Sequence, residues 1–339
     1  EHLLGAKFEC PTCRSRVEVP WSEKLAFPKR PIESSRSDGY WVPASFPLDC
    51  AKCRASFEVN IEKKPIESRW TLYGDEAGRY IHKQISGQEV DLHFFCITLV
   101  ALHGRMHKRF QRSIRKCKKS IAPTLDPSDW QHHFTDIWSA KPTSQTFVLK
   151  NKKQKVAYAR EFARLIRKAR PELATFNVSG CIRVPTTKKE RARHIKHQKE
   201  EIFSQSILTT LEQLRSFGKG VAWVFDNIKD ASDGRRTEGW AEECFLGLQY
   251  TRLFAYLSAG AVVLKPQFVS PGSHFLLETA DFVSYCVARE FEMGARGKKT
   301  ELPTAMLGKG FYQATLGNGD VHHKWATSLP LKEYYGIDV

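Results

Sequence analysis

The stretch WTLYGDEAG at residues 70–78 is an apolar strand pattern that ends on two adjacent carboxylates, Asp75 and Glu76. The 339-residue chain around it is strongly basic, with a formal net charge of +16. A carboxylate placed beside apolar side chains is costly to bury unless a cation or a metal ion pairs with it. An acidic pair at a strand end of a basic protein therefore indicates a specific role.

Two further acids follow the same pattern. The apolar run VAWVF at residues 221–225 ends on Asp226, and Asp281 lies within the apolar run FLLETADFVSY at residues 275–285. Carboxylate oxygens are the ligands that divalent cations such as Mg²⁺ prefer. Three such acids in a basic chain predict a divalent-metal site that faces a phosphate backbone.

Each acid also has an ordinary interpretation that the residues leave open. Asp75 can cap a turn before Gly78, and Asp226 can begin an Asx-turn with Asn227. Asp281 can be a solvated residue on a helix. The joint placement of all three acids beside strongly apolar neighbours favours the metal site over these alternatives.

The three motifs together resemble the domain-of-unknown-function family 3800. Its members show a strand ending in Asp-Glu-Ser/Ala-Gly, a mid-chain strand ending in Phe-Asp, and a late helix with Leu-Gln-x-Ala-Asp-x-x-x-Tyr. The corresponding segments here are GDEAG at 74–78, FD at 225–226 and LETADFVSY at 277–285. The resemblance covers residues 68–295. It implies an RNase H-like fold and a metal-dependent nuclease, met in prokaryotic mobile-element and phage-defence settings, where an ATPase or other defence component is an expected partner.

The resemblance also implies a site. In an RNase H-like sheet the first strand lies beside a later strand, so Asp75 and Asp226 are expected to be adjacent, and a late helix brings Asp281 across the strand ends. We expect these three residues to bind two Mg²⁺ or Mn²⁺ ions that hydrolyse phosphodiester bonds. Glu76 is a further catalytic candidate. Glu278 is an auxiliary one, because it shares a helix face with Asp281 at a spacing of three.

Two positions depart from the family pattern. Relatives carry a Glu-x-His element, and the nearest segment here is WQHH at 130–133, with Gln131 in place of the glutamate. A neutral amide is a poor ligand for a hard cation. Glu278 replaces the usual glutamine. The site is therefore attenuated, or altered to silence it, or completed by another acid: Asp129, Asp136 or Glu76. His133 is a candidate for positioning phosphate or moving a proton, although a histidine without a site role is the commoner case.

The nine cysteines include two C-x2-C pairs, CPTC at 10–13 and CAKC at 50–53. Thiolates at this spacing reach one tetrahedral ion, and two pairs complete a zinc ribbon. We expect a structural Zn²⁺ held by Cys10, Cys13, Cys50 and Cys53. Two disulfides or four free thiols are the alternatives. A zinc ribbon implies a reducing, cytoplasmic setting.

Positive charge is concentrated in three segments. Residues 105–119 hold eight Lys/Arg and no acid, residues 152–170 hold eight Lys/Arg with one acid, and residues 188–199 are also basic. Such clustering predicts salt-sensitive binding of a DNA or RNA backbone, with an acidic partner protein as the alternative. The nucleic-acid-binding candidates on the first segment are Arg105, Lys108, Arg109, Arg112, Arg115 and Lys116.

The elements alternate as in an α/β protein. The sequence predicts a zinc ribbon at 1–62, an RNase H-like domain with a mixed sheet flanked by helices at 63–295, and a tail of uncertain structure at 296–339. Strands are expected at about 69–74, 80–86, 92–102, 173–184, 221–226 and 261–269. Helices are expected at about 104–120, 152–169, 187–217, 238–258 and 274–293.

No apolar run approaches the length of a membrane span, and no secretory leader is recognised, so no membrane association is expected. Two functions remain from different classes. The first is a metal-dependent nuclease. The second is a non-catalytic nucleic-acid-binding or adaptor subunit of a larger defence complex that keeps the fold with a degenerate site.

Overall fold

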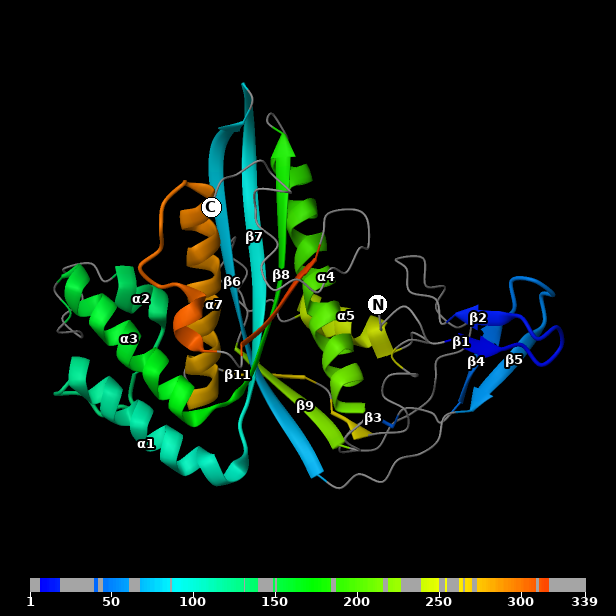
Figure 1. Ribbon diagram of the computed structural model, residues 1–339, viewed down its shortest axis with the longest axis horizontal. Coiled ribbons are helices and arrows are strands. Elements are labelled where there is room, and N and C mark those ends of the chain that lie inside the picture. The colour runs from blue at the N-terminus through cyan, green and yellow to red at the C-terminus, as the bar shows by residue number, and fades with distance from the viewer. Residues whose placement is uncertain are drawn as a thin grey trace. The chain divides into compact units, whose positions relative to one another are not determined.

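The computed structural model describes residues 7–18, 40–41, 45–60, 68–85, 87–130, 132–139, 149, 151–183, 187–215, 219–226, 239–249, 254, 262–264, 266–269, 273–308 and 311–316. The chain divides into two compact units (Figure 1). One comprises residues 1–72, 203–223 and 237–267, and the other comprises residues 73–202, 224–236 and 268–339. Within the described part of the chain, no helix is both long enough and apolar enough to cross a membrane.

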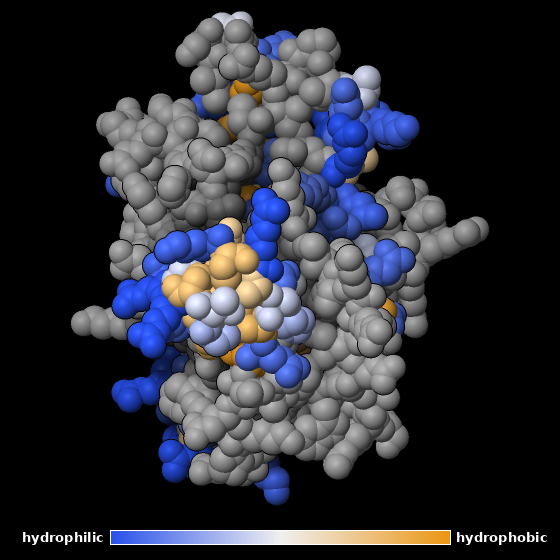
Figure 2. Space-filling view, turned by 90° about the vertical axis from the view of Figure 1, so that its right-hand side faces the viewer, coloured by the Kyte–Doolittle hydropathy of each residue, from blue (hydrophilic) through white to orange (hydrophobic). Residues whose placement is uncertain are grey.

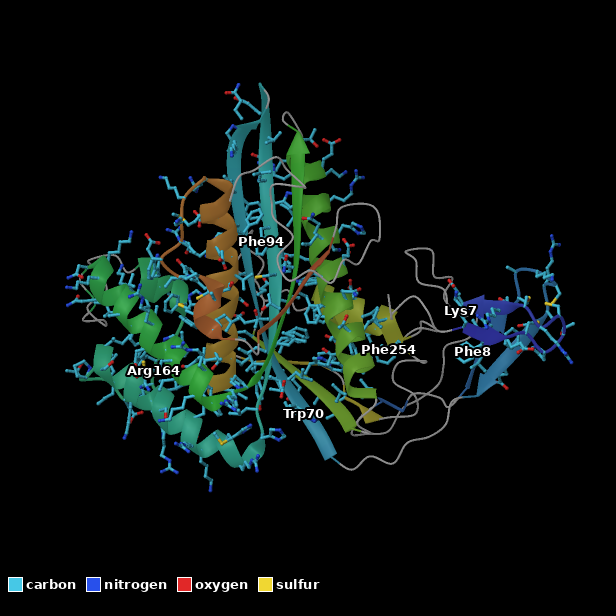
Figure 3. All side chains as sticks on the ribbon, in the orientation of Figure 1. Lys7, Phe8, Trp70, Phe94, Arg164 and Phe254 are labelled. Atoms are coloured by element: carbon cyan, nitrogen blue, oxygen red, sulfur yellow. The ribbon has the colours of Figure 1, made fainter. Side chains whose placement is uncertain are left out.

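The first unit contains two small antiparallel hairpins. One pairs β1 (Lys7–Glu9) with β2 (Arg16–Glu18), and the other pairs β4 (Ser45–Asp49) with β5 (Ser56–Asn60). Lys7 and Phe8, labelled in Figure 3, mark the first hairpin. Each hairpin carries one C-x2-C pair in its turn, so the turns present the cysteines predicted for the ribbon.

The rest of the first unit packs around aromatic side chains. Strand β10 (Val262–Val263) pairs in parallel with β9 (Lys219–Asp226) through Val263 and Val221, and antiparallel with β3 (Tyr40–Trp41). Helix α5 (Gly239–Gln249) places Phe245 against Trp223 at 5.9 Å between ring centroids. The sequence predicts a helix at 238–258, but the described part of α5 ends at residue 249.

The second unit is built on a mixed sheet. Strands β6 (Ser68–Ile85), β7 (Gln88–Ala101) and β8 (Glu172–Arg183) are successive antiparallel neighbours. Strand β12 (Phe311–Leu316), from the region where the sequence predicts no element, runs parallel to β8 at its outer edge. On the other side of β6 lies β9, and β11 (Gln267–Val269) also pairs with β9. The strand order is therefore β12-β8-β7-β6-β9.

The prediction of two separate strands at 69–74 and 80–86 is wrong, because β6 is one continuous strand. The intervening glycines stay in the ladder, with Gly74 opposite Leu99 and Gly78 opposite Phe95. Gly74 is required for close packing. A Cβ there would lie 2.5 Å from the Phe225 ring and 2.9 Å from Leu99. This glycine therefore lets the side chain that precedes Asp226 lie directly against β6.

Helix α7 (Phe275–Ala295) lies against the sheet, and α1 (Gly104–Ile121), α2 (Phe134–Ser139) and α3 (Lys152–Ala169) lie on its other side (Figure 1). Of the 21 residues of α7, only Arg289, Glu290 and Glu292 are not buried. A helix that is buried all round belongs to the middle of a core. Phe94 of β7, labelled in Figure 3, stacks on Phe291 of α7 at 4.5 Å. The helices predicted at 104–120, 152–169 and 274–293 are confirmed.

The opposite face of the sheet contacts helix α4 (Lys188–Arg215) through its first turns, residues 188–202. Lys199 lies 5.1 Å from the Phe95 ring centroid, and Arg191 pairs with Asp91 at 2.5 Å. The Thr187 hydroxyl accepts from the backbone N–H of Glu190, whose carboxylate accepts in return from Thr187, so these two residues form a capping box at the start of α4. The second unit therefore has helices on both faces of its sheet.

Candidate carboxylate site and cysteine cluster

Side chains alternate between the two faces along β6, and this separates the two adjacent acids. The Asp75 side chain points to the α7 face, where its pKa is raised by Asp281 and Asp226 as well as by burial. The backbone carbonyl of Asp75 also accepts from the Ser284 hydroxyl of α7 at 3.0 Å. Glu76 points to the α4 face, where its carboxylate lies 3.4 Å from Lys199. The structure therefore does not bring Glu76 into the site of Asp75.

The same alternation places Asp226 beside Asp75. The Phe225 ring occupies the space next to Gly74, on the α4 face of the sheet. The next residue, Asp226, therefore points to the α7 face, where its charge raises the pKa of Asp75. Strands β6 and β9 thus each contribute one carboxylate to the same face of the sheet.

Asp281 completes the group from the buried face of α7. Its Oδ2 accepts from the backbone N–H of Phe134 at 2.6 Å, and its charge raises the pKa of Asp75. His133 Nε2 lies 3.8 Å from Asp281 Oδ1. The three acids predicted from the sequence are therefore brought together by β6, β9 and α7. We call Asp75, Asp226 and Asp281 the carboxylate site.

Burial and mutual repulsion dominate the electrostatics of the carboxylate site. Burial raises the pKa of Asp75 well above its usual range, and the charges of Asp281 and Asp226 raise it further. Burial also raises the pKa of Asp281 to about 6, although His133 and the Phe134 N–H act in the opposite direction. A proton or a cation relieves such repulsion. Three hard oxygen donors fit Mg²⁺ or Mn²⁺ by their chemistry.

The spacing of these acids is wider than that of a closed metal cage. Among the described residues, the four cysteines of the hairpins are the one group of three or more potential ligands whose donor atoms all lie within 4.8 Å of one another. The carboxylate site is therefore an open arrangement of three acids that share one face of the sheet.

Glu278 is engaged elsewhere. It is 4% exposed and forms a buried ion pair with Lys118 of α1, and its Oε1 also accepts from the His132 N–H at 3.2 Å. Burial raises the pKa of Glu278, while Lys118 acts to lower it. The sequence predicts Glu278 as an auxiliary to Asp281. In the structure its carboxylate instead forms an ion pair with Lys118.

Two carboxylates of α7, Glu278 and Asp281, accept hydrogen bonds from the backbone of residues 132–134, at the start of α2. Glu278 accepts from the N–H of His132, and Asp281 accepts from the N–H of Phe134. Lys118 adds a hydrogen bond to the Trp130 carbonyl at 2.8 Å. These contacts fix His133 between two anchored residues. Its side chain is 45% exposed, and its Nδ1 lies 3.1 Å from Asp136 Oδ2.

Lys118 is not among the site residues predicted from the sequence, because it stands in a run of basic residues whose other charges lie on the exposed face of the helix. The signal was present in the spacing. Lys118 follows Phe110 and Ile114 at steps of eight and four residues, and all three are buried. A lysine on the apolar stripe of a helix needs a buried acid as its partner. Gln131, the other departure from the family pattern, lies outside the described residues.

His132 is buried and remains neutral. Its ring stacks on Phe162 at 4.5 Å, and burial lowers its pKa to about 3. His132 therefore acts as a core aromatic residue in the packing of α2 and α3, whereas the neighbouring His133 is the histidine that reaches the carboxylate site.

The four cysteines predicted as metal ligands lie together. Cys10 Sγ is 3.6 Å from Cys53 Sγ, and Cys13 Sγ is 3.5 Å from Cys50 Sγ. None of the four is in a disulfide, which removes that alternative. The Ser15 hydroxyl lies 3.1 Å from Cys50 Sγ and lowers the pKa of this thiol to about 6, which favours the thiolate that metals bind. The group can hold one metal ion.

The basic face of α1 is exposed. Its apolar stripe packs inward, and the opposite face carries the predicted nucleic-acid-binding residues, which are all exposed: Arg105, Lys108, Arg109, Arg112, Arg115 and Lys116. Arg115 also lies 4.0 Å from Asp126. This face of α1 therefore presents positive charge to solvent, whereas Lys118 of the same helix is buried.

No family model matches the chain, and no curated protein is similar to it. The resemblance of its three acidic motifs therefore stays a prediction, and function has to be argued from the carboxylate site and its surroundings.

Proposed function

We propose that the protein is a metal-dependent nuclease that hydrolyses phosphodiester bonds at Asp75, Asp226 and Asp281. The observation that carries the proposal is the convergence of these three carboxylates, from two strands and a buried helix, on one face of the sheet. Each would be costly to ionise alone in this position. Their mutual repulsion is the electrostatic pattern of a site that binds a cation or a proton.

The arrangement of strands supports an RNase H-like sheet as the frame of this site. Strand β6, which carries Asp75, lies between its hairpin partner β7 and the later strand β9, which carries Asp226. Strand β8 continues the antiparallel series beyond β7. This is the relation between first and later strands that the motif resemblance implies.

The residues of the chain have separable tasks in this proposal. Asp75, Asp226 and Asp281 would hold the divalent ion, whose chemistry would be to activate a water and to stabilise the leaving oxygen. The Phe134 N–H fixes one oxygen of Asp281, and the Glu76 N–H donates to Asp75 Oδ1 at 2.8 Å, so both carboxylates are oriented before a ligand binds. His133, exposed beside Asp281, is placed to contact a phosphate oxygen.

The basic face of α1 supplies attraction for the substrate. Exposed Lys and Arg side chains contact phosphates and release counterions, which gives affinity with little sequence preference. We propose that this face binds the backbone of DNA or RNA. A setting in phage defence, with an ATPase or another defence protein as partner, rests on the motif resemblance alone.

We further propose that the four-cysteine cluster holds Zn²⁺ in a structural role. Four thiolates in two hairpin turns match the tetrahedral ligand set that zinc prefers, and they leave no position for a substrate. The ion would then hold β1–β2 to β4–β5, which bury little apolar surface of their own.

A second function is favoured by the pairing of Glu278 with Lys118. This ion pair removes one acid of α7 from the carboxylate site. A site with fewer available carboxylates binds metal ions less tightly. The alternative is therefore a non-catalytic nucleic-acid-binding or adaptor subunit that keeps the fold and the basic face.

Cleavage assays separate the two functions. We would incubate the protein with single- and double-stranded DNA and RNA in Mg²⁺, in Mn²⁺ and in a chelator. The nuclease requires metal-dependent cleavage that Asp75→Asn, Asp226→Asn and Asp281→Asn each nearly abolish, while the exposed Asp126→Asn control cleaves like the parent. Binding without cleavage in any metal, or equal cleavage by all variants, would rule out the nuclease.

The basic face needs its own test. Neutralising Arg112, Arg115 and Lys116 together should weaken binding and lower the slope of log affinity against log salt by about 2 to 3. Residual cleavage should persist at high protein concentration, because the carboxylate site is unchanged. An unchanged salt slope would assign nucleic-acid binding to another surface.

A further inference from the structure

The two cysteine turns repeat one backbone structure. The N–H of Cys10 donates to the Ser15 carbonyl at 2.9 Å, and that of Cys50 donates to the Ala55 carbonyl at 2.9 Å. In each turn the residue after the second cysteine donates back to the first cysteine, Arg14 to Cys10 and Arg54 to Cys50, both at 2.8 Å. The turns are therefore equivalent, and each places an arginine at the same position beside the shared cluster.

Both arginines adopt a backbone conformation that suits glycine. Arg14 has a φ of 56° and Arg54 a φ of 61°, in the left-handed region. A side chain at such a position brings its Cβ close to the following carbonyl, whereas glycine has no such contact. Local folding therefore favours glycine at both positions, and the chain places arginine at both. A strained position that recurs points to a use of the side chain.

Among the residues that the structure describes, the fold makes no use of these side chains. Arg14 and Arg54 are exposed, and within the described part of the chain neither guanidinium has a hydrogen bond or an ion pair. The same holds for the exposed Lys52 of the second turn and for Arg16 just after the first. By contrast, Lys7 on β1 is paired with Glu18 at 2.9 Å.

The free charges lie at the turns and the acids lie on the strands. Residues 10–16 and 50–55 contain no Asp or Glu, whereas the acids of the two hairpins are Glu9, Glu18, Asp49 and Glu58. Figure 2, which looks from the side on which Figure 1 draws the hairpins, shows hydrophilic side chains (blue) beside a patch of hydrophobic (orange) and intermediate (pale) ones. The turn surface thus presents unpaired guanidinium groups around one compact cluster.

We propose that the surface formed by Arg14, Arg54 and Lys52 is a second nucleic-acid contact, which grips backbone phosphates independently of the basic face of α1. Arginine suits this use because its planar fork donates two parallel hydrogen bonds to a phosphate. The ligand rests on the proposed function, since it is the substrate of that function, but the surface needs no cleavage chemistry. The two cysteine hairpins therefore bind the nucleic-acid backbone in addition to their structural role.

Glycine substitution gives a test in which stability and binding respond differently. The variant R14G/R54G removes both guanidinium groups and supplies the residue that the backbone prefers. We would measure binding of a fluorescent single-stranded DNA and RNA by anisotropy in the full chain, between about 50 and 200 mM salt. Zinc content and the rate of zinc transfer to a chelator report on the ribbon. The variant K298Q/K299Q, which removes two exposed charges outside the ribbon, is the matched control.

The expected result is weaker binding by R14G/R54G, with a salt slope lower by about 1.5 than that of the parent, as for two lost phosphate contacts. Zinc content should be unchanged and zinc transfer no faster than in the parent. R14K/R54K, which keeps the charges, should recover most of the slope.

Three results would overturn the proposal. The first is binding by R14G/R54G equal to that of K298Q/K299Q. The second is loss of zinc from R14G/R54G, which would assign the arginines to the fold. The third is a parent that binds neither DNA nor RNA. A parent that binds but does not cleave removes the nuclease and leaves the ribbon contact standing, so the two proposals fail separately.

Discussion

Replacing Asp281 by asparagine should stabilise the metal-free protein at neutral pH. The pKa of Asp281 rises from its ordinary 3.8 to about 6 on folding, which corresponds to about 3 kcal/mol of free energy lost when the folded protein ionises this group. Asparagine keeps an oxygen that can accept from the Phe134 N–H, and it carries no charge to be buried. We therefore expect a net gain of about 1 to 3 kcal/mol, or roughly 2 to 8 °C in Tm.

The pH dependence follows from the direction of the pKa change. Between pH 3.8 and about 6 the folded protein binds more protons at Asp281 than the unfolded chain does, so the stability contribution of this group falls as the pH rises. Asp281→Asn removes that loss. Its advantage should be near zero below pH 4, grow through this window and be constant above about pH 6.5. Thermal unfolding in a chelator across this pH range measures it.

Metal provides an independent check on the same variant. Mn²⁺ should raise the Tm of the parent through preferential binding to the folded state and leave Asp281→Asn nearly unchanged. Asp126→Asn is the control. Asp126 is exposed, and hydrogen bonds from Ser128 lower its pKa, so the same substitution should give no gain. A Tm for Asp281→Asn that is lower than the parent at pH 7, or a difference that does not vary with pH, would refute the free-energy cost of ionising the buried Asp281.

Three other predictions concern packing and the cysteine cluster. Lys118→Met should cost about 3–5 kcal/mol of unfolding free energy, because it leaves Glu278 ionised and buried, and adding Glu278→Gln should recover part of the loss. Gly74→Ala should cost about 1–3 kcal/mol, because its Cβ meets the Phe225 ring at 2.5 Å. Cys50→Ser should abolish the zinc binding proposed for the cysteine cluster and unfold the hairpins without lowering the unfolding temperature of the second unit.

Each of these has a direct check. Lys116→Met, an exposed change on the same helix, should be close to neutral in chemical denaturation, and an equal cost at both positions would contradict a buried ion pair. Gly78→Ala is the control for Gly74, since its Cβ would meet atoms no closer than 3.7 Å. Elemental analysis reports on Cys50, and full zinc content in Cys50→Ser would exclude it as a ligand.

The three acids of the carboxylate site and the four clustered cysteines could be predicted from the sequence, because the patterns that identify them span only a few neighbouring residues. An apolar run that ends on aspartate predicts a strand end, which is confirmed for Asp226 at the end of β9 but wrong for Asp75, which lies in the interior of β6. A C-x2-C pair predicts a turn around a metal ion. It was harder to predict to which face of the sheet each acidic side chain points. Asp75 and Glu76 are neighbours in sequence, and only the position of Phe225 against Gly74 shows which of them shares a face with Asp226.

Long-range pairing accounts for the other differences. The glycines of β6 are turn signals in isolation, yet the ladder to β7 carries the strand through them. The pairing of β12 with β8 joins residues far apart in the chain, and nothing in the local pattern of 311–316 specifies the partner. The buried role of Lys118 could not be predicted from its basic neighbours, because its partner Glu278 lies 160 positions further along the chain.

The burial of α7 also sets the order in which this protein can mature on the ribosome. This helix occupies the middle of its unit, yet it is made after the helices and most of the strands that enclose it. The 126 residues from 170 to 295 take about 6–25 s to translate at about 5–20 residues per second. Throughout that interval α1 and α3 have no α7 to pack against, and the nascent chain exposes apolar surface that chaperones recognise. Asp281 arrives with the helix, so the three carboxylates can come together only after residue 281 has been synthesised.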